Sequence, residues 1–287
     1  MRYQISHTTH YTYSQAVFLN HHVLRLRPRS DGSQQVHQFS IEIDPLPRLT
    51  TEYAEMNDTA ALGVWFENTT TPYLKIRTIS EVETCRTNPF DYLIEPWAAK
   101  LPVDYPQSIA TLLAPYLAPV FTPAITPDII HLAQNILVEV DGSLSYFLTT
   151  LTQRIYDECT YIVREQGDPF PAGVTWQQRR GSCRDFAVVF VEACRAVGLA
   201  ARFVSGYQEG DPDQATHDLH AWAEVYVPGG GWRGFDPTHG LAVADRHVAI
   251  ATGPHPRLAA PVTGTLREGV QARSTLTTHI SMKPMLT

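Results

Sequence analysis

The sequence has little cysteine, little charge and no long hydrophobic run. Only four of its 287 residues are cysteine, and none of them forms a C-x-x-C pair, so a disulfide scaffold is excluded and free thiols are expected. No stretch approaches the ~18 consecutive apolar residues of a membrane span. The first residues also hold no apolar run of signal-peptide length. We therefore expect a cytoplasmic protein with no membrane partner.

Charged residues of either sign are also few. Charged residues make up 18% of the chain, and the net charge is −7 with a pI near 5.9. A mildly acidic protein of this kind is poorly suited to the phosphate backbone, so we expect no nucleic-acid partner. The hydrophobic fraction of 44% over this length is enough for a sizeable core and for two domains. Nothing in the sequence indicates an oligomeric state.

Two parts of the chain differ in pattern. Residues 1–84 alternate polar and apolar side chains between turn clusters, which predicts an antiparallel β domain, placed at residues 1–96. A proline-punctuated connector covers residues 88–106, and a second domain with a helical lead-in is placed at residues 97–287. Five histidines fall in the first part, where surface or cross-strand positions are favoured over a metal site: His7, His10, His21, His22 and His37.

Helical periodicity follows the connector. The pattern predicts helices at residues 106–119, 126–140, 143–161 and 183–197, with Thr126 as the N-cap of the second. Strands are predicted at residues 200–208, 217–227 and 232–240, after the last helix. One helix followed by antiparallel strands is an α+β arrangement.

One cysteine stands at the start of a predicted helix, in the stretch "RRGSCRDFAVVF". Ser182 and Asp185 have the S-x-x-D spacing of a capping box, which makes Cys183 the first helical residue. The helix dipole there favours a thiolate over a thiol. A helix terminus alone shifts a pKa by less than ~1 unit, so nucleophilic chemistry also needs a histidine.

Three histidines lie downstream, and one of them is on a predicted strand. His217 and His239 fall in loops, whereas His220 begins a strand and is preferred as the base. Asp236 lies on the next strand. If residues 228–230 form the turn, Asp236 shares a face with His220 and lies within diagonal reach, but an even-length loop would reverse this. A packing cysteine and a turn aspartate are the alternatives that the spacing leaves open.

These residues also carry a family resemblance. The stretches "GSCRDFAVVFVEACRAVGLAARFVSGY" and "HAWAEVYVPGGGWRGFDPTHG" resemble the bacterial transglutaminase-like superfamily, which includes predicted cysteine peptidases. The stretch "RYQISHTTHYTYSQAVFLNHHVLRLRPR" resembles the N-terminal β domain of one branch, as do "NPFDY" and "RHVAIATG". The resemblance implies a papain-like α+β core with a catalytic triad of Cys183, His220 and Asp236.

The expected function follows from the triad. We expect a thiol-dependent enzyme that cleaves amide bonds in a peptide or protein through a thioester, as a peptidase or amidase. Transfer of the acyl group to an amine and a peptide-binding module with vestigial catalysis are the alternatives. The backbone N–H of Cys183 would stabilise the oxyanion, with Tyr161 favoured over Trp176, Gln177 and Gln178 as second donor. This chemistry requires no metal and no cofactor.

Overall fold

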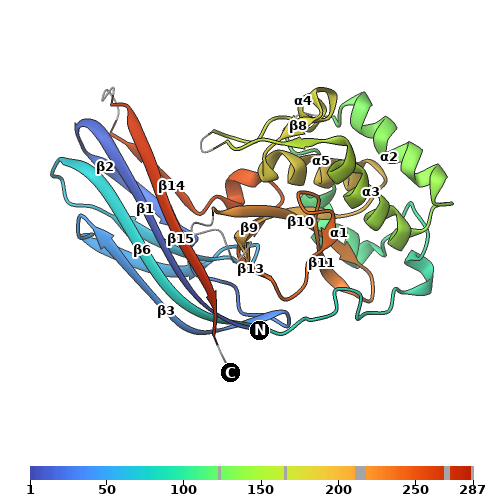
Figure 1. Ribbon diagram of the computed structural model, residues 1–287, viewed down its shortest axis with the longest axis horizontal. Coiled ribbons are helices and arrows are strands. Elements are labelled where there is room, and N and C mark those ends of the chain that lie inside the picture. Colours follow the sequence, from blue (N-terminus) through green and yellow to red (C-terminus); the bar gives the residue numbers. More distant parts are fainter. Residues whose placement is uncertain (122–123, 165–166, 211–217, 268–271, 286–287) are drawn as a thin grey trace.

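The chain forms a β sandwich and an α/β lobe that lie side by side (Figure 1). The computed structural model describes residues 1–121, 124–164, 167–210, 218–267 and 272–285. The predicted α+β class with antiparallel sheets is confirmed. Within the described ranges, no helix is both long enough and apolar enough to span a lipid bilayer.

The sandwich consists of two antiparallel sheets with four described strands each. One sheet has the order β15-β1-β6-β3 and the other the order β14-β2-β5-β4. Alternate residues of β1 are buried, as the two-residue period predicts. The strands are β1 (Arg2–Val17), β2 (Leu19–Leu24), β3 (Gln34–Asp44), β4 (Leu49–Ala54), β5 (Ala60–Trp65), β6 (Thr71–Thr84), β14 (Val262–Leu266) and β15 (Ser274–Pro284).

The last two strands depart from the expected domain assignment. The sequence pattern assigned residues 97–287 to one C-terminal unit, but β14 pairs with β2 and β15 pairs with β1. The two ends of the chain therefore share the sandwich. Pairing between strands so far apart along the chain depends on the tertiary fold, and alternation within either strand does not reveal it. The boundary near residue 96 itself stays a prediction.

Helices cover the far side of the second lobe (Figure 1). Thr126 is the N-cap of the second of them, as predicted, with Pro127 in its first turn. The third ends at Glu158, three residues before the predicted end, and Cys159 is its C-cap. The elements are η1 (Pro96–Ala98), α1 (Gln107–Leu117), α2 (Pro127–Glu139), α3 (Leu144–Glu158) and α4 (Ala172–Gln178), with short parallel strands β7 (Thr160–Tyr161) and β8 (Arg180–Gly181).

The centre of this lobe is an antiparallel sheet with the order β12-β11-β10-β9-β13, on which helix α5 (Cys183–Ala196) packs. The α5 side chains are almost all buried, and Gly198 follows the helix with a φ of +78°, as its predicted place after the C-cap requires. The strands are β9 (Ala201–Gln208), β10 (His220–Val227), β11 (Gly231–Asp236), β12 (Leu241–Ala242) and β13 (His247–Gly253), with η2 (Pro256–Ala259) beyond them.

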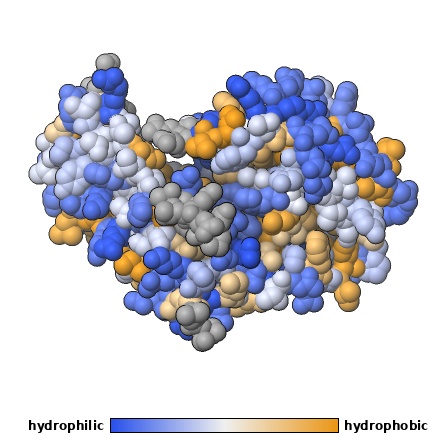
Figure 2. Space-filling view, in the orientation of Figure 1, coloured by the Kyte–Doolittle hydropathy of each residue, from blue (hydrophilic) through white to orange (hydrophobic). Residues whose placement is uncertain are grey.

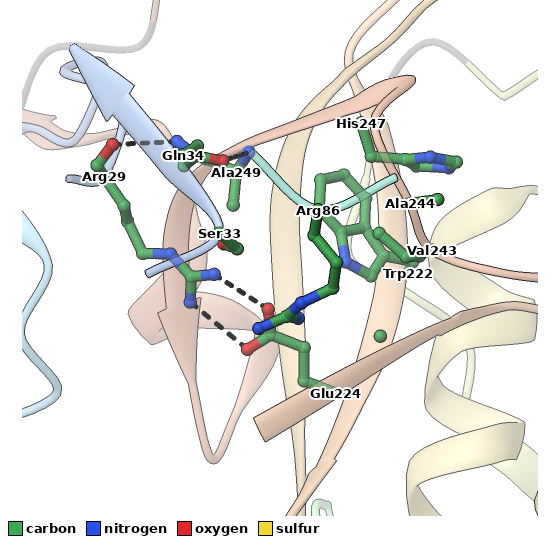
Figure 3. A pocket seen from close by; sticks show the side chains of 11 residues that line it. Arg29, Ser33, Gln34, Arg86, Trp222, Glu224, Val243, Ala244, His247 and Ala249 are labelled. Carbon is green, nitrogen blue, oxygen red and sulfur yellow. Dashed lines mark hydrogen bonds and ion pairs between the residues drawn. The ribbon is translucent and has the colours of Figure 1, made fainter. Parts of the chain in front are cut away.

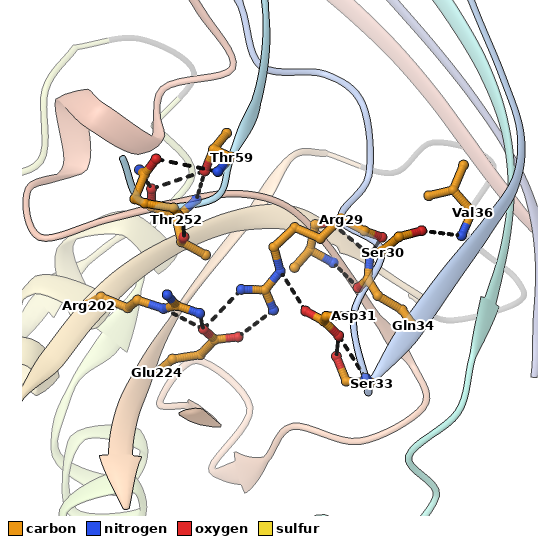
Figure 4. Close-up of polar contacts among 12 residues, drawn as sticks. Arg29, Ser30, Asp31, Ser33, Gln34, Val36, Thr59, Arg202, Glu224 and Thr252 are labelled. Atoms are coloured by element: carbon orange, nitrogen blue, oxygen red, sulfur yellow. Dashed lines mark hydrogen bonds and ion pairs between the residues drawn. The ribbon is translucent and has the colours of Figure 1, made fainter. Parts of the chain in front are cut away.

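Buried polar contacts join the sandwich to this sheet (Figure 4). Arg29 of the sandwich donates two hydrogen bonds to the Glu224 carboxylate on β10, at 2.8 and 3.2 Å. Arg202 on β9 holds the same carboxylate from the other side at 2.7 Å. The Gln34 side chain pairs with both backbone groups of Ala249 on β13. The sandwich is thus fixed against the central sheet.

Candidate active site

The start of α5 is fixed by a buried carboxylate. Asp185 is fully buried and accepts from the backbone N–H and the hydroxyl of Ser182, at 2.7 and 2.8 Å. The backbone N–H of Phe170 and Arg164 Nη1 also donate to it, each at 2.7 Å. The predicted capping box is therefore present, with further donors around it. These contacts hold Cys183 in the first turn of the helix.

The strand register brings His220 and Asp236 together. Val227 pairs with Gly231, so the turn has the odd length that places Asp236 two residues from the position opposite His220. His220 Nε2 lies 2.7 Å from Asp236 Oδ2. The register that the sequence left open is the one that permits this contact, because both side chains leave the same face of the sheet.

Cys183, the third residue of the expected triad, also lies near the His220 imidazole. Cys183 and His220 line the same cleft, and the Cys183 side chain helps to raise the pKa of the imidazole. Since Nε2 faces Asp236, Nδ1 is the nitrogen left for the sulfur. Burial disfavours the charged imidazolium, but the Asp236 charge and the hydrogen bonds outweigh it and raise the pKa of His220 well above its usual value. Burial likewise opposes ionisation of Asp236, but His220 and His247 hold the pKa of that carboxyl well below its usual range.

A fourth residue, His247 on β13, belongs to the same cluster. Its Nε2 lies 3.0 Å from Asp236 Oδ2, the oxygen that His220 also contacts. Burial lowers the pKa of His247 despite the nearby carboxylate, so its neutral form donates to Asp236. Figure 3 shows its ring beside that of Trp222, with the ring centroids 5.2 Å apart in a T-shaped arrangement. Sequence reasoning missed His247, which only the stretch "RHVAIATG" could have suggested.

Of the other two candidate histidines, only His239 lies within the described residues. The His239 ring lies 5.2 Å from the His220 ring, and burial lowers its pKa. No hydrogen bond between the His239 side chain and a described residue is found in this cluster. His217 lies outside the described residues. The structure therefore brings His220, the preferred base, to both Cys183 and Asp236.

Of the four candidates for a second oxyanion donor, one lines the same cleft as Cys183. Tyr161 is half-exposed there, and burial, followed by the charge of Cys183, raises its pKa to about 12, so its hydroxyl stays a donor. Trp176 is buried beneath the guanidinium of Arg179. Gln177 is exposed and donates to Asp128. Gln178 is exposed and, like these two, does not line the cleft.

Cys183 and His220 lie in a cleft of about 450 Å³ between the two lobes. The space-filling view is hollowed where the sandwich meets the α/β lobe (Figure 2). One wall belongs to the α/β lobe and includes Tyr161, Arg164, Arg184 and Asp218. The other wall belongs to the sandwich and includes Thr9, Tyr11, Val262, Leu276, Thr277 and Thr278. A volume of this size is typical of a ligand site.

The cluster also has the composition of a metal site. One ligand atom from each of His220, Asp236 and His247 lies within 4.8 Å of the other two. Asp236 Oδ2 already accepts from both imidazoles, however, and Asp236 Oδ1 accepts from the backbone N–H of Thr238 at 2.9 Å. The hydrogen bonds account for this arrangement without an ion. Among the five histidines of the N-terminal region, His7 is buried. Its two ring nitrogens are already hydrogen-bonded, one to Tyr207 and the other to Thr9.

Comparisons with known proteins identify the family to which the chain is similar. Residues 130–237 match the model of the transglutaminase-like superfamily, and residues 3–83 match that of the bacterial transglutaminase-like N-terminal region. An uncharacterised protein of Mycobacterium tuberculosis is 31% identical over 273 residues, which cover 88% of this chain and 83% of that protein. A protein-glutamine gamma-glutamyltransferase of Pseudomonas aeruginosa is 38% identical over 71 residues, which cover 22% of this chain and 11% of that enzyme.

A solved structure has the same fold over the whole chain. The crystal structure of a candidate cysteine protease from Cytophaga hutchinsonii superposes with a TM-score of 0.76 at 23% identity. The superposition covers 100% of this chain and 91% of that one, so it includes the sandwich as well as the α/β lobe.

Proposed function

The chain belongs to the transglutaminase-like superfamily, and from that premise we propose that it is a thiol-dependent enzyme that cleaves amide bonds in peptides or proteins. Cys183 is the nucleophile, His220 the general base and acid, and Asp236 the residue that orients His220. One observation carries the proposal: a single imidazole bonds a buried carboxylate and lies in the same cleft as a helix-terminal thiol that acts on its pKa.

In the first half of the reaction, His220 takes the thiol proton and the sulfur of Cys183 attacks the amide carbon, forming a carbon–sulfur bond. The carbonyl oxygen becomes an oxyanion, which accepts hydrogen bonds from the backbone N–H of Cys183 and the hydroxyl of Tyr161. The carbon–nitrogen bond then breaks as His220 gives its proton to the nitrogen. The amine leaves, and a thioester on Cys183 remains.

In the second half, His220 removes a proton from water, and the resulting oxygen nucleophile attacks the thioester carbon. The carbon–sulfur bond breaks as His220 gives that proton to the sulfur, so the acid leaves and the Cys183 thiol is restored. Asp236 stabilises the imidazolium in both halves, which is consistent with the raised pKa of His220.

Acyl transfer to an amine is the second candidate, and the match to the Pseudomonas aeruginosa gamma-glutamyltransferase favours it. The chemistry differs only in the group that attacks the thioester, since a primary amine replaces water and a new amide forms. Exclusion of water from the cleft would favour transfer.

Capture of the acyl-enzyme tests the proposal. The protein is mixed with cell lysate, quenched in acid and digested, and the peptide that contains Cys183 is analysed by mass spectrometry. We expect an acyl adduct on Cys183 that is absent from the Cys183→Ala variant. Added lysine analogue then shows which acceptor resolves the thioester, because transfer yields an amide of that amine. An adduct pattern that is the same in both proteins would contradict the proposal.

A further inference from the structure

Strand β15 is an edge strand with a long, regular ladder on one side. It pairs with β1 from Tyr3–Pro284 to Tyr13–Ser274 without a register shift. In the described part of the chain, no strand pairs with its other edge. An edge strand presents its outward N–H and C=O groups to any chain segment that can pair with them.

Hydrogen bonds at the two ends of the β1–β15 ladder show which backbone groups of β15 point away from β1. The Met285 N–H donates to the carbonyl of Arg2 at 2.8 Å, and the Ser14 N–H donates to the carbonyl of Arg273 at 2.9 Å. Hydrogen-bonded pairs alternate along an antiparallel ladder, so odd-numbered β15 residues bond to β1. The backbone groups of even-numbered residues, including Leu276 and Thr278, therefore point away from β1.

The same residues border the candidate active site. Leu276, Thr277 and Thr278 all line the cleft that contains Cys183. Successive side chains of a strand point to opposite faces, so three in a row can line one cleft only where the cleft meets the strand at its edge.

Beside the cleft, this edge lacks the features that usually block strand addition, because Lys283 and Pro284 stand at the far end of β15. At the opposite edge of the sheet, β3 has a register shift between Val36 and Gln38, and carries the carboxylates of Glu42 and Asp44. From Ser274 to Met282, β15 contains no Asp, Glu, Lys or Arg. Natural proteins protect exposed edges with charges and bulges, so an uninterrupted, uncharged edge beside a cleft is suited to pairing.

We propose that the free edge of β15 is the docking strand for an extended, uncharged segment of the polypeptide substrate. The segment adds to the sheet through main-chain hydrogen bonds with Leu276 and Thr278, which places a neighbouring amide at Cys183. The sandwich residues that line the cleft carry no charge, so a charged side chain that points at this wall would lose hydration without gaining a partner on it. This inference rests on the proposed function and names the chemistry of its substrate.

Protection of Cys183 from iodoacetamide tests the docking strand separately from catalysis. The probe is a pool of capped peptides of about eight residues, long enough to lie along the strand, made from Ala, Ser, Thr, Val and Leu. We expect this pool to slow alkylation of Cys183 in the wild-type protein. A second pool with N-methylated backbones and a third with Glu and Lys added are expected to protect less, because they lose pairing hydrogen bonds or add unpartnered charge.

Two variants at residue 278 isolate the contribution of the outward N–H of Thr278 to peptide binding. Thr278→Pro removes this donor without touching the ladder to β1, whereas Thr278→Ala keeps the donor and loses only the side chain. Each rate is normalised to that variant's own rate without peptide. We expect protection to be about fivefold weaker in Thr278→Pro than in Thr278→Ala, as the loss of one hydrogen bond predicts.

Several results would overturn the docking strand. Equal protection by the plain and N-methylated pools in the wild-type protein would do so even if Thr278→Pro did not fold. Equal protection in the two variants would do so as well. A wild-type dimer that Thr278→Pro converts to a monomer, without a change in peptide protection, would assign the edge to a second copy of the chain. A Cys183 that alkylates no faster than the fully buried Cys194 would instead contradict the proposed function.

Discussion

Asp236 on β11 contacts His220 on β10 at 2.7 Å, two residues away from the position directly opposite. This diagonal contact is set by the odd-length turn between the two strands. The contact with Asp236 leaves the other side of the His220 imidazole for Cys183, which is the first residue of α5. Three residues from two strands and a helix therefore come together at one site.

Asp236→Asn should lower the pKa of His220. The amide keeps the shape of the carboxylate but loses its charge, so burial of the imidazole then dominates. Activity should fall by at least about a hundredfold, since an uncharged partner no longer stabilises the imidazolium. NMR titration of the His220 ring measures the shift, and an unchanged titration curve would show that Asp236 does not hold the charge.

The four thiols should differ in reactivity. Cys194 is fully buried, and burial raises its pKa well above the usual value. Burial also raises the pKa of Cys159 to about 11. Cys85 is exposed and serves as an internal reference. At pH 7 we expect Cys183 to alkylate at least about tenfold faster than Cys85, as activated thiols do. Peptide mapping after iodoacetamide gives the rates, and parity between Cys183 and Cys194 would refute the ranking.

His247 should act as a positioning residue for the Asp236 carboxylate. His247→Ala removes one of two imidazole donors to Asp236 Oδ2, which should shift the acidic limb of the Cys183 alkylation profile to higher pH. Reactivity at neutral pH should fall by about tenfold, the effect of one hydrogen bond to a charged group. His247→Gln can still donate and should restore part of the loss. An acidic limb that stays in place in His247→Ala would leave His247 a purely structural role.

The Glu224 ion pairs should matter for stability. Glu224→Gln leaves Arg202 buried without its ion-pair partner and leaves Arg29 with Asp31 alone, at 3.3 Å, which should lower the free energy of unfolding at pH 7 by about 3–5 kcal/mol. The exposed Glu42→Gln change is the control and should cost less than about 1 kcal/mol. Denaturant titration measures both variants.

The loss of stability caused by Glu224→Gln should depend on pH. Burial opposes ionisation of Glu224, but Arg29 and Arg202 outweigh it and lower its pKa to about 2. A depressed pKa stabilises the fold above the unfolded value of ~4.3, and this contribution disappears as the pH falls toward 2. The gap in stability between wild type and Glu224→Gln should therefore narrow on acidification. A constant gap from neutral to acidic pH would show that the carboxylate charge is not responsible.

Local patterns predicted most of the elements and the start of the candidate site. The capping residues Ser182 and Asp185 located the start of α5 to the residue, because a capping box is a local signal. The β10–β11 contact required a register that the sequence permits but does not determine. His247 and β15 were missed, because they reach the site through pairing between distant strands. The compartment and the expected lack of nucleic-acid or membrane partners stay predictions from charge and hydropathy.

The central claim is that His220 activates Cys183, and the pH dependence of Cys183 alkylation tests it most directly. The wild-type protein and His220→Ala are treated with iodoacetamide across the acidic and neutral range, with Cys85 as the internal reference. We predict that Cys183 of the wild type already reacts rapidly at neutral pH, whereas in His220→Ala its rate falls toward that of Cys85 and rises only in alkaline solution. Superimposable profiles in the two proteins would contradict the account.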